Sequence, residues 1–160
     1  MCSSDLVISI VGCSDLKMQQ IGKETNDKLA SVAIGPFGNR DEQLLNRELQ
    51  RLISINGIAE AKYELKTQIS YSASGTLAVQ GSSSVLKRAS MTVSFQLVDL
   101  ASNNVQLQGS VTGNATTGSV SSLYGIDKSE QHARERLVIM LAQRTLQRLQ
   151  LHFLSRKGQG

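Results

Sequence analysis

The spacing of hydrophobic and polar positions changes several times along the chain, and each change predicts a new secondary-structure element. Between Leu29 and Ile34 apolar residues alternate and then stop at Gly35-Pro36, which predicts a short strand and a turn. Asn39 is followed three residues later by Glu42, the spacing of a capping box at a helix start. The predicted helix carries one apolar stripe: Leu45, Leu49, Leu52 and Ile53.

Beyond Asn56-Gly57, which we expect to end this helix as a left-handed C-cap, the period falls to two. Three half-buried strands are predicted, the first passing a bulge at Gly75 before Leu77 and Val79. Gly81–Ser84 and Ser102–Asn104 are predicted turns. The core-facing positions are Tyr63, Leu65, Thr67, Ile69 and Tyr71, then Met91, Val93, Phe95 and Leu97, then Val105, Leu107, Gly109 and Val111.

A Gly/Ser/Thr-rich loop is predicted from Asn114 to Gly125, followed by a long helix. Asp127 is expected to cap this helix, with Glu130 at the third position. Its expected apolar side comprises Ala133, Leu137, Met140, Leu141, Leu149 and Phe153. Its expected polar side, a solvated face or a contact surface, comprises Arg134, Arg136, Arg144, Arg148 and Arg156.

The predicted order is therefore strand, helix, three strands, helix. A strand-helix-strand start implies a right-handed crossover and a parallel pair, while the later strands form hairpins. Because each strand has a single apolar face, both helices should cover the same face of a four-stranded mixed sheet, an α+β fold. The second and third strands are long, so we expect their turn to project beyond the helices.

Composition places the chain among globular proteins with one domain. The net charge and the positions of the cysteines add information about possible partners and about the fold. The formal net charge of +4 makes an anionic partner plausible, although many soluble domains carry such a charge without one. The cysteines are Cys2 and Cys13, both near the N-terminus. The fold is therefore expected to hold neither a disulfide nor a cysteine-based metal site.

Residues with catalytic chemistry are sparse, and we predict no catalytic site, no metal site, no cofactor and no enzyme activity. His132 and His152 are about 30 Å apart along one helix, so they cannot share a site. The hydroxyls of Ser121 and Ser122 have no evident histidine partner. Glu60 and Glu64 are better explained by a solvated strand end than by an acid–base pair.

A basic nucleic-acid-binding domain is one alternative for such a chain. Single-strand binders present aromatic side chains on an open sheet face. Here Tyr63, Tyr71 and Phe95 follow the apolar alternation and are expected in the core, and the wet face is rich in Gln, Ser and Thr. We therefore expect no nucleic-acid partner.

The N-terminus carries a short apolar run, Val7–Gly12, that ends at Cys13 and is too short to span a bilayer. Ile10-Val11-Gly12-Cys13 resembles a bacterial lipobox, in which the cysteine thiol receives a diacylglycerol; a buried strand is the alternative reading. Because no basic residue precedes the run, we expect residues 1–12 to be a truncated signal peptide whose first six residues are artefactual. Residues 13–28 would be a lipidated polar tether, and residues 29–157 the domain.

Several strings, taken in order with the lipobox and the element order, resemble LptE, the lipopolysaccharide-assembly lipoprotein family, especially its alphaproteobacterial branch. They are Asn46-Arg47-Glu48-Leu49, Lys87-Arg88-Ala89, Val93–Asp99, Ser122-Leu123-Tyr124-Gly125 and Ala133-Arg134-Glu135-Arg136. The resemblance covers about Cys13 to Phe153. The family's aromatic residue after the lipidated cysteine is replaced here by Ser14-Asp15, and Ser14 favours export to the outer membrane.

This resemblance implies a partner, a ligand and a location. Family members plug the β-barrel LptD at the periplasmic side of the outer membrane and are thought to bind lipopolysaccharide. By loose alignment, Lys87, Arg88 and Lys128 would contact lipopolysaccharide, and Cys13 would carry the lipid anchor; each cation could instead be an ordinary solvated residue. A periplasmic lipoprotein of another envelope complex is the second alternative.

Overall fold

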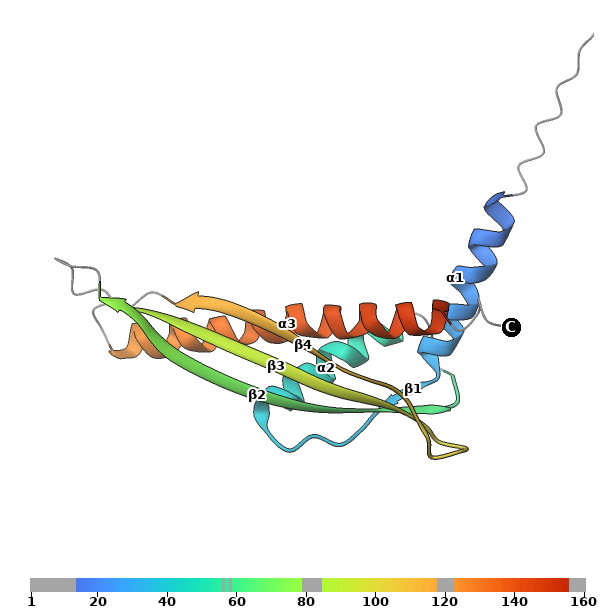
Figure 1. Cartoon of the computed structure of the whole chain (residues 1–160), viewed down its shortest axis with the longest axis horizontal. Helices are drawn as coiled ribbons and strands as arrows, with labels where there is room; N and C mark the ends of the chain where they lie inside the picture. The colour runs from blue at the N-terminus through green and yellow to red at the C-terminus, as the bar shows by residue number, and fades with distance from the viewer. Residues whose placement is uncertain (1–13, 56, 58, 79–84, 118–122, 156–160) are drawn as a thin grey trace, which may run out of the picture.

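The computed structural model of the protein describes residues 14–55, 57, 59–78, 85–117 and 123–155 (Figure 1). The strands form one sheet in the order β1-β2-β3-β4, with β1 parallel to β2 and the other neighbours antiparallel. The predicted mixed sheet of an α+β fold is confirmed. The elements are α1 (Ser14–Ala30), β1 (Val32–Ile34), α2 (Arg40–Ser54), β2 (Tyr63–Ala78), β3 (Val85–Asp99), β4 (Val105–Thr117) and α3 (Leu123–Ser155).

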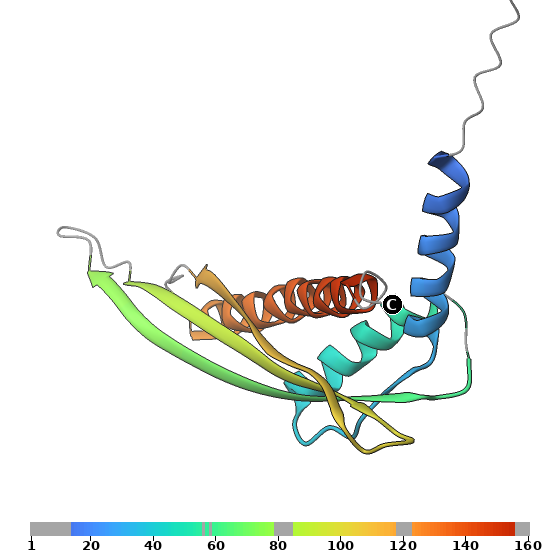
Figure 2. The ribbon, with the colours of Figure 1, turned by 45° about the vertical axis from the view of Figure 1, so that its right-hand side comes forward.

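Both predicted helices cover the same face of the sheet, and the other face is open (Figure 2). α3 packs along β3 and β4, while α2 packs on β1 and β2 and against α3. The core between the layers is aliphatic. Side chains that are no more than 3% exposed include Leu45, Leu49, Leu65, Met91, Val93, Phe95, Leu97, Leu137, Leu141, Leu149 and Phe153.

The period-two prediction holds for most of the sheet. Tyr63, Ile69 and Tyr71 pack against the core from β2, and every predicted inward residue of β3 is buried. Val105 is an exception: it is 52% exposed, because β4 begins at a turn that extends away from α3 (Figure 1). The register shift after Gly75 confirms the bulge. Val79 and the turn at 81–84, with its predicted projection, lie outside the described residues.

The turn between β3 and β4 and the two ends of α2 form as predicted. Asn103 adopts a positive φ of 54° in the turn. At the start of α2, the Asn39 Oδ1 accepts from the Glu42 backbone N–H at 2.9 Å. At its end, Gly57 has a φ of 102°, which favours glycine, and its N–H donates to the Ser54 carbonyl oxygen at 3.1 Å.

The segment before β1 differs from the prediction. Leu29 and Ala30 were predicted to begin a strand, but they form the last turn of α1, and β1 holds only three residues. Leu29 is fully buried as a helical residue, and Thr25, one turn earlier, is 8% exposed. Tertiary packing of α1 against α2 and α3 therefore decides the conformation. The polar composition of residues 17–28 gave no sign of this helix.

The predicted loop from Asn114 to Gly125 is also shorter than expected. Its first four residues extend β4 by pairing with Lys87–Ser90, because β3 begins at Val85 and offers them partners. α3 begins at Leu123, so Asp127 lies inside the helix and does not cap it. Residues 114–117 thus form a strand because they can hydrogen-bond to β3, although their composition is typical of a loop.

A buried polar cluster fixes the loop between β1 and α2 against β2. Asn46 is 4% exposed; its Nδ2 donates to the Gly35 carbonyl at 3.1 Å, and its Oδ1 accepts from Thr67 Oγ1 at 3.1 Å. Glu42 is 8% exposed and accepts from the Gly38 and Ile69 N–H groups at 2.7 and 3.3 Å. Both of these buried side chains therefore have hydrogen-bond partners, and they hold the loop, α2 and β2 together.

Candidate binding surfaces at the hairpin end and on the open sheet face

Lys87 and Arg88, the two cations predicted where the hairpin returns, are neighbours in β3 but belong to opposite faces of the sheet. Side chains alternate along a strand, and the buried Ala89 and Met91 mark the helix-covered face. Lys87 therefore belongs to the helix-covered face and Arg88 to the open face. Both side chains are exposed. The structure does not bring these two cations together in one site.

Lys128, the third predicted cation, is exposed near the start of α3, where its Nζ donates to Gln131 Oε1 at 3.2 Å. This end of α3 lies beside the β2–β3 hairpin end (Figure 1). Lys87 also acts electrostatically on Glu130 of α3. The pKa of Glu130 is lowered most by a hydrogen bond from Tyr71, next by Arg134, and least by the charge of Lys87. Lys87 and Lys128 thus occupy one end of the molecule.

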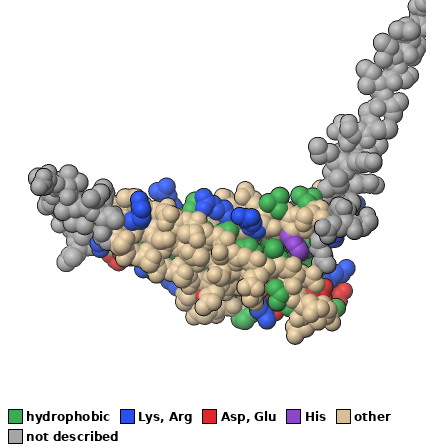
Figure 3. Space-filling model, in the orientation of Figure 1, with side chains coloured by type: hydrophobic (Ala, Val, Ile, Leu, Met, Phe, Trp, Pro, Cys, Tyr) green, Lys and Arg blue, Asp and Glu red, His purple; other side chains and the backbone are tan. Residues whose placement is uncertain are grey.

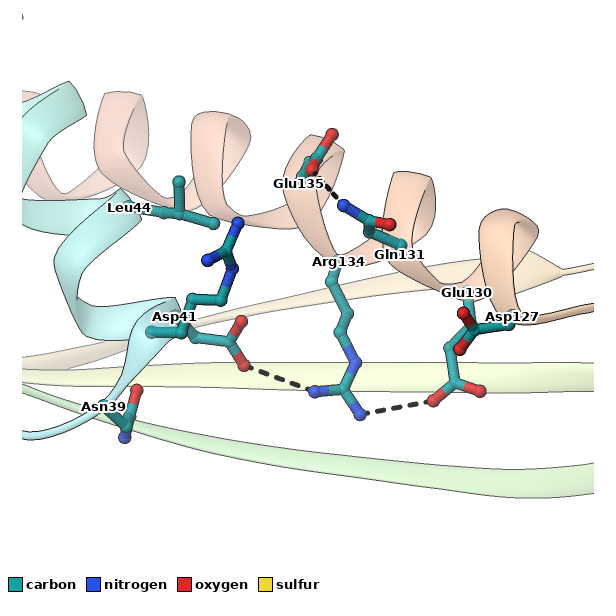
Figure 4. A pocket seen from close by; sticks show the side chains of 9 residues that line it. Asn39, Asp41, Leu44, Asp127, Glu130, Gln131, Arg134 and Glu135 are labelled. Carbon is teal, nitrogen blue, oxygen red and sulfur yellow. Dashed lines mark hydrogen bonds and ion pairs between the residues drawn. The ribbon is translucent and has the colours of Figure 1, made fainter. Parts of the chain in front are cut away.

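Arg134 was predicted on a solvated face, but it is half-buried at the centre of a polar cluster (Figure 4). Its guanidinium lies 3.8 Å from the centroid of the Tyr71 ring, a cation–π contact. Its Nη1 is 3.5 Å from Asp41 Oδ2, and its Nη2 is 3.2 Å from Glu130 Oε1. Tyr71 Oη donates to the same Glu130 oxygen at 3.1 Å, while burial raises the Tyr71 pKa.

The Arg134 cluster connects α2, β2 and α3. Sequence contained one signal for it, the i, i+4 spacing of Glu130 and Arg134 on a helix. The contributions of Asp41 and Tyr71 come from distant segments and could not be read from local spacing. Arg136, Arg144 and Arg148 are exposed as predicted, and Arg156 lies outside the described residues.

A cavity of about 580 Å³ lies between the start of α2 and the first half of α3 (Figure 4). Carboxylates outnumber cations in its lining, so its field does not favour a phosphate or another anion. Arg134 is already paired there, which leaves Arg40 as the other lining cation. The charged residues of this cavity therefore connect α2, α3 and the β2–β3 hairpin. The ionisable lining residues are Arg40, Asp41, Asp127, Glu130, Arg134 and Glu135.

The open face of the sheet is polar and nearly uncharged. Among its described strand residues only Glu64, Lys66 and Arg88 carry a charge, and Glu64 pairs with Lys66 at 3.5 Å. A hollow of about 660 Å³ lies over the middle of this face. Figure 3 shows the face as a broad, mostly tan surface. Its polar lining residues are Lys66, Gln68, Ser94, Gln96, Gln108 and Ser110.

The aromatic residues of the described strands face the helices and not this open face. Phe95 is 3% exposed on the helix side, where its ring lies over Gly109: a Cβ at Gly109 would be 3.0 Å from Phe95 Cζ. The Tyr63 ring contacts the Phe153 ring of α3 in a tilted arrangement with centroids 5.4 Å apart, and the Tyr71 ring contacts Arg134. These three strand aromatics therefore lie on the helix-covered side of the sheet, as their place in the apolar alternation predicts.

The other sequence candidates do not form a site. His132 is exposed, and its Nδ1 lies 3.7 Å from Glu135 Oε2, while the His152 ring contacts the Phe153 ring in a tilted arrangement. Within the described residues no group of His, Cys, Asp and Glu could hold a metal ion. Cys13, Ser121 and Ser122 lie outside the described part of the chain. No described helix is both long and apolar enough to cross a bilayer.

Solved structures of several lipoproteins share the fold with this chain. A candidate lipoprotein from Caulobacter crescentus is 16% identical with a TM-score of 0.65, over 81% of this chain and 95% of that one. Rare lipoprotein B from Shewanella oneidensis is 14% identical with a TM-score of 0.63, over 79% and 97%. A minor lipoprotein from Acinetobacter baumannii is 18% identical with a TM-score of 0.51, over 75% and 90%. At these identities the likeness establishes the fold alone.

No curated protein matches the chain in sequence. A family model does: LptE, described as lipopolysaccharide-assembly, matches residues 29–149. This match covers the sheet, α2 and most of α3, and it agrees with the resemblance found in the sequence strings. The chain belongs to the LptE family of lipopolysaccharide-assembly proteins.

Proposed function

We propose that this protein is an outer-membrane lipoprotein, anchored by acyl chains on Cys13, that fills the lumen of the LptD β-barrel and assists lipopolysaccharide transport into the outer membrane. The match of the LptE family model to residues 29–149 carries the proposal. Membership in an assembly family also agrees with the expectation that the protein is not an enzyme.

The described body has properties that a barrel plug needs. The helix layer and the sheet are joined by an aliphatic core, and the Arg134 cluster adds ion pairs between α2 and α3 and within α3. The body is therefore compact and well connected. Its open face presents Gln, Ser, Thr and Asn side chains with few charges, and the lumen of a large barrel is polar. A neutral polar face can contact such a wall without burying unpaired charge.

The proposed lipopolysaccharide contacts are Lys87 and Lys128 at the hairpin end, with Arg88 contributing from the open face. Lipopolysaccharide is an anionic phosphoglycolipid, and fixed cations recognise phosphate by charge-assisted hydrogen bonds. All three side chains are exposed. Because the side chains of Lys87 and Arg88 belong to opposite faces of the sheet, we expect them to contribute separately. Lys87 and Lys128 are the pair that lies on the helix-covered side at the hairpin end.

Affinity capture from membranes tests the plug. A tagged copy of the complete gene should retrieve a large β-barrel protein from detergent-solubilised outer membranes. In a Cys13→Ser variant the acyl mass should disappear from the mature chain and the protein should leave the membrane fraction. Capture of other envelope proteins without a barrel would favour the alternative, a lipoprotein of a different envelope complex. Residence in the cytosol with bound nucleic acid would overturn the proposal.

Single substitutions test the lipid contacts. Lys87→Gln and Lys128→Gln should each weaken lipopolysaccharide binding by about tenfold, as expected for one lost charge-assisted contact to phosphate. Lys62→Gln is the matched control, because Lys62 is an exposed cation just before β2, at the other end of the hairpin. Binding that falls equally in the control, or does not fall in either variant, would remove these residues from the proposed site.

A further inference from the structure

β4 is the last strand of the sheet, and its outer edge has no neighbour among the described strands (Figure 2). Exposed strand edges are usually protected by charged side chains, proline or irregular pairing. β4 contains no charged residue and no proline, and its pairing with β3 is regular from Leu107 to Thr117. Its outer edge therefore keeps the hydrogen-bonding geometry that another strand requires.

A hydrogen bond from Arg144 shows which backbone groups of β4 point away from β3. Its Nη1 donates to the Thr112 carbonyl oxygen at 2.7 Å. Backbone groups of alternate residues point to the same side of a strand, so those of Asn114 and Thr116 point outward as well. Both residues are exposed. Because the Thr112 carbonyl already has a partner, an added strand would pair from Asn114 onward.

A groove of about 710 Å³ lies between the end of β4 and α3, next to these outward groups. Five α3 residues in its lining recur at intervals of three and four, so they share one face of the helix. The β4 side of the groove is about 10 Å long and the α3 side about 21 Å, which leaves room for a strand of about three to six residues. We call this site the edge groove; its α3 face consists of Ser129, His132, Arg136, Met140 and Gln143, and its β4 side is Asn114–Thr117.

The edge groove is cationic and partly apolar. No carboxylate lines it, and Arg136 takes part in none of the ion pairs found among the described residues. His132 is the other ionisable residue of its α3 face, and its Nδ1 lies 3.7 Å from Glu135 Oε2. Met140 supplies apolar surface, and Gly113 makes room for it, since a Cβ at Gly113 would lie 2.5 Å from Met140 Cε. A ligand that fits this groove therefore carries negative charge beside an aliphatic group.

We propose that the edge groove receives an extended segment of the barrel protein, which adds a fifth strand to the sheet at Asn114 and Thr116. In strand addition the main-chain hydrogen bonds supply affinity, and pockets for alternate side chains supply specificity. Side chains of the added strand alternate between the open face and α3. Those that face α3 would include an aliphatic residue at Met140 and an Asp or Glu at Arg136.

The chemistry of the edge favours a polypeptide of another protein over a lipid or a second copy of this chain. The outward backbone of Asn114 and Thr116 offers N–H donors and carbonyl acceptors together, whereas a phosphate only accepts hydrogen bonds. A second copy that paired through its own β4 would bring no carboxylate, and it would place Arg136 and Arg144 of both copies at one interface. The inference rests on the proposed function, because the barrel is the protein that would surround this body.

Competitive capture of the barrel tests the charge of the edge groove. Each tagged full-length variant is expressed beside untagged wild type, and the share of barrel that it retrieves from outer membranes is measured. Arg136→Glu should lower that share at least about tenfold, because it places like charges together. Arg148→Glu is the matched control: Arg148 is exposed on the same helix but does not line the groove, and its reversal should change the share less than about threefold.

Proline substitution tests the backbone edge itself. Thr116→Pro removes an outward N–H and leaves the hydrogen bonds to β3 in place, so barrel capture should fall about fivefold, as expected for one lost hydrogen bond. Gln108→Pro is the control, because it removes an outward N–H from the same edge before the groove begins. Arg136→Glu keeps the test decisive if proline disturbs the strand, since that side chain is exposed.

A benzophenone photo-cross-linker placed at Gln143 of the acylated full chain identifies the occupant. It should attach to one segment of the barrel that contains an Asp or Glu and alternating aliphatic residues. Attachment to a second copy or to lipopolysaccharide would overturn the inference. If wild type retrieves no barrel, the proposed function fails and the inference fails with it. If wild type, Arg136→Glu and Thr116→Pro retrieve the barrel equally, the inference alone fails.

Discussion

Glu42 offers the sharpest test of how the β1–α2 loop is held on the sheet. Its carboxylate accepts from the Gly38 N–H at 2.7 Å and from the Ile69 N–H at 3.3 Å while only 8% exposed. A hydrogen bond to a charged group contributes about 1.5–3 kcal/mol, and the longer Ile69 contact should lie at or below the low end. Gly38 is exposed, so its N–H regains water after substitution. We therefore expect Glu42→Ala to cost about 3 kcal/mol and Glu42→Gln about 1–2 kcal/mol.

The same contacts give the Glu42 effect a pH dependence. The Gly38 N–H, and after it the Ile69 and Asn39 groups, lower the pKa of Glu42 against an opposing effect of burial. A carboxyl whose pKa is lowered in the folded state binds fewer protons there than in the unfolded chain. Its contribution is therefore complete above its unfolded pKa of about 4.3, and is lost as pH falls through the folded pKa.

Urea unfolding followed by circular dichroism measures both effects. The free energy of unfolding of wild type should exceed that of Glu42→Gln at neutral pH, and the difference should shrink below about pH 4. Glu60→Gln is the matched control, because Glu60 is exposed, and its difference from wild type should stay near zero. A cost below about 0.5 kcal/mol for Glu42→Ala at neutral pH, or a Glu42→Gln difference independent of pH, would refute the reasoning.

Two further substitutions probe contacts between α3 and the sheet. Gly113→Val should destabilise by about 1–3 kcal/mol, because the new side chain meets Met140 and Leu137, and Met140→Ala in the same chain should recover part of the loss in thermal unfolding. Full stability of the single variant would show that α3 shifts freely. Tyr71→Phe removes the hydrogen bond that most lowers the Glu130 pKa, so that pKa should rise in an NMR titration; an unchanged value would mean that Arg134 alone sets it.

Sequence patterns predicted the parts of the fold that local periodicity controls. The alternation through Met91 and Phe95 and the cap at Asn39 depend on neighbours a few residues away, and both predictions are confirmed. α1 has no clear apolar period, and among its residues with described side chains only Thr25 and Leu29 are buried. Its helix is therefore set by tertiary contacts that local patterns do not contain. The extension of β4 beyond Asn114 likewise required a partner strand.

The candidate cations illustrate a signal that was present but not used. The period of two through Met91, continued back along the strand, already assigns Lys87 to the inner face and Arg88 to the outer face. The expectation that Lys87 and Arg88 both contact lipopolysaccharide did not take that period into account. The pairing of Arg134 could not be predicted in the same way, because Asp41 and Tyr71 are far from it in sequence.

The shortness of β1 has a consequence for self-association. β1 pairs only with Tyr63–Leu65, so among the described strands none covers the outer edge of β2 beyond that point. An uncovered strand edge is a template on which another copy of the chain can add a strand. Glu42 occupies one donor on this edge by accepting from Ile69, and the irregularity after Gly75 interrupts its regular spacing. Both features hinder regular pairing along this edge, so we expect the loop between β1 and α2, through Glu42, to oppose strand addition as well as to stabilise the fold.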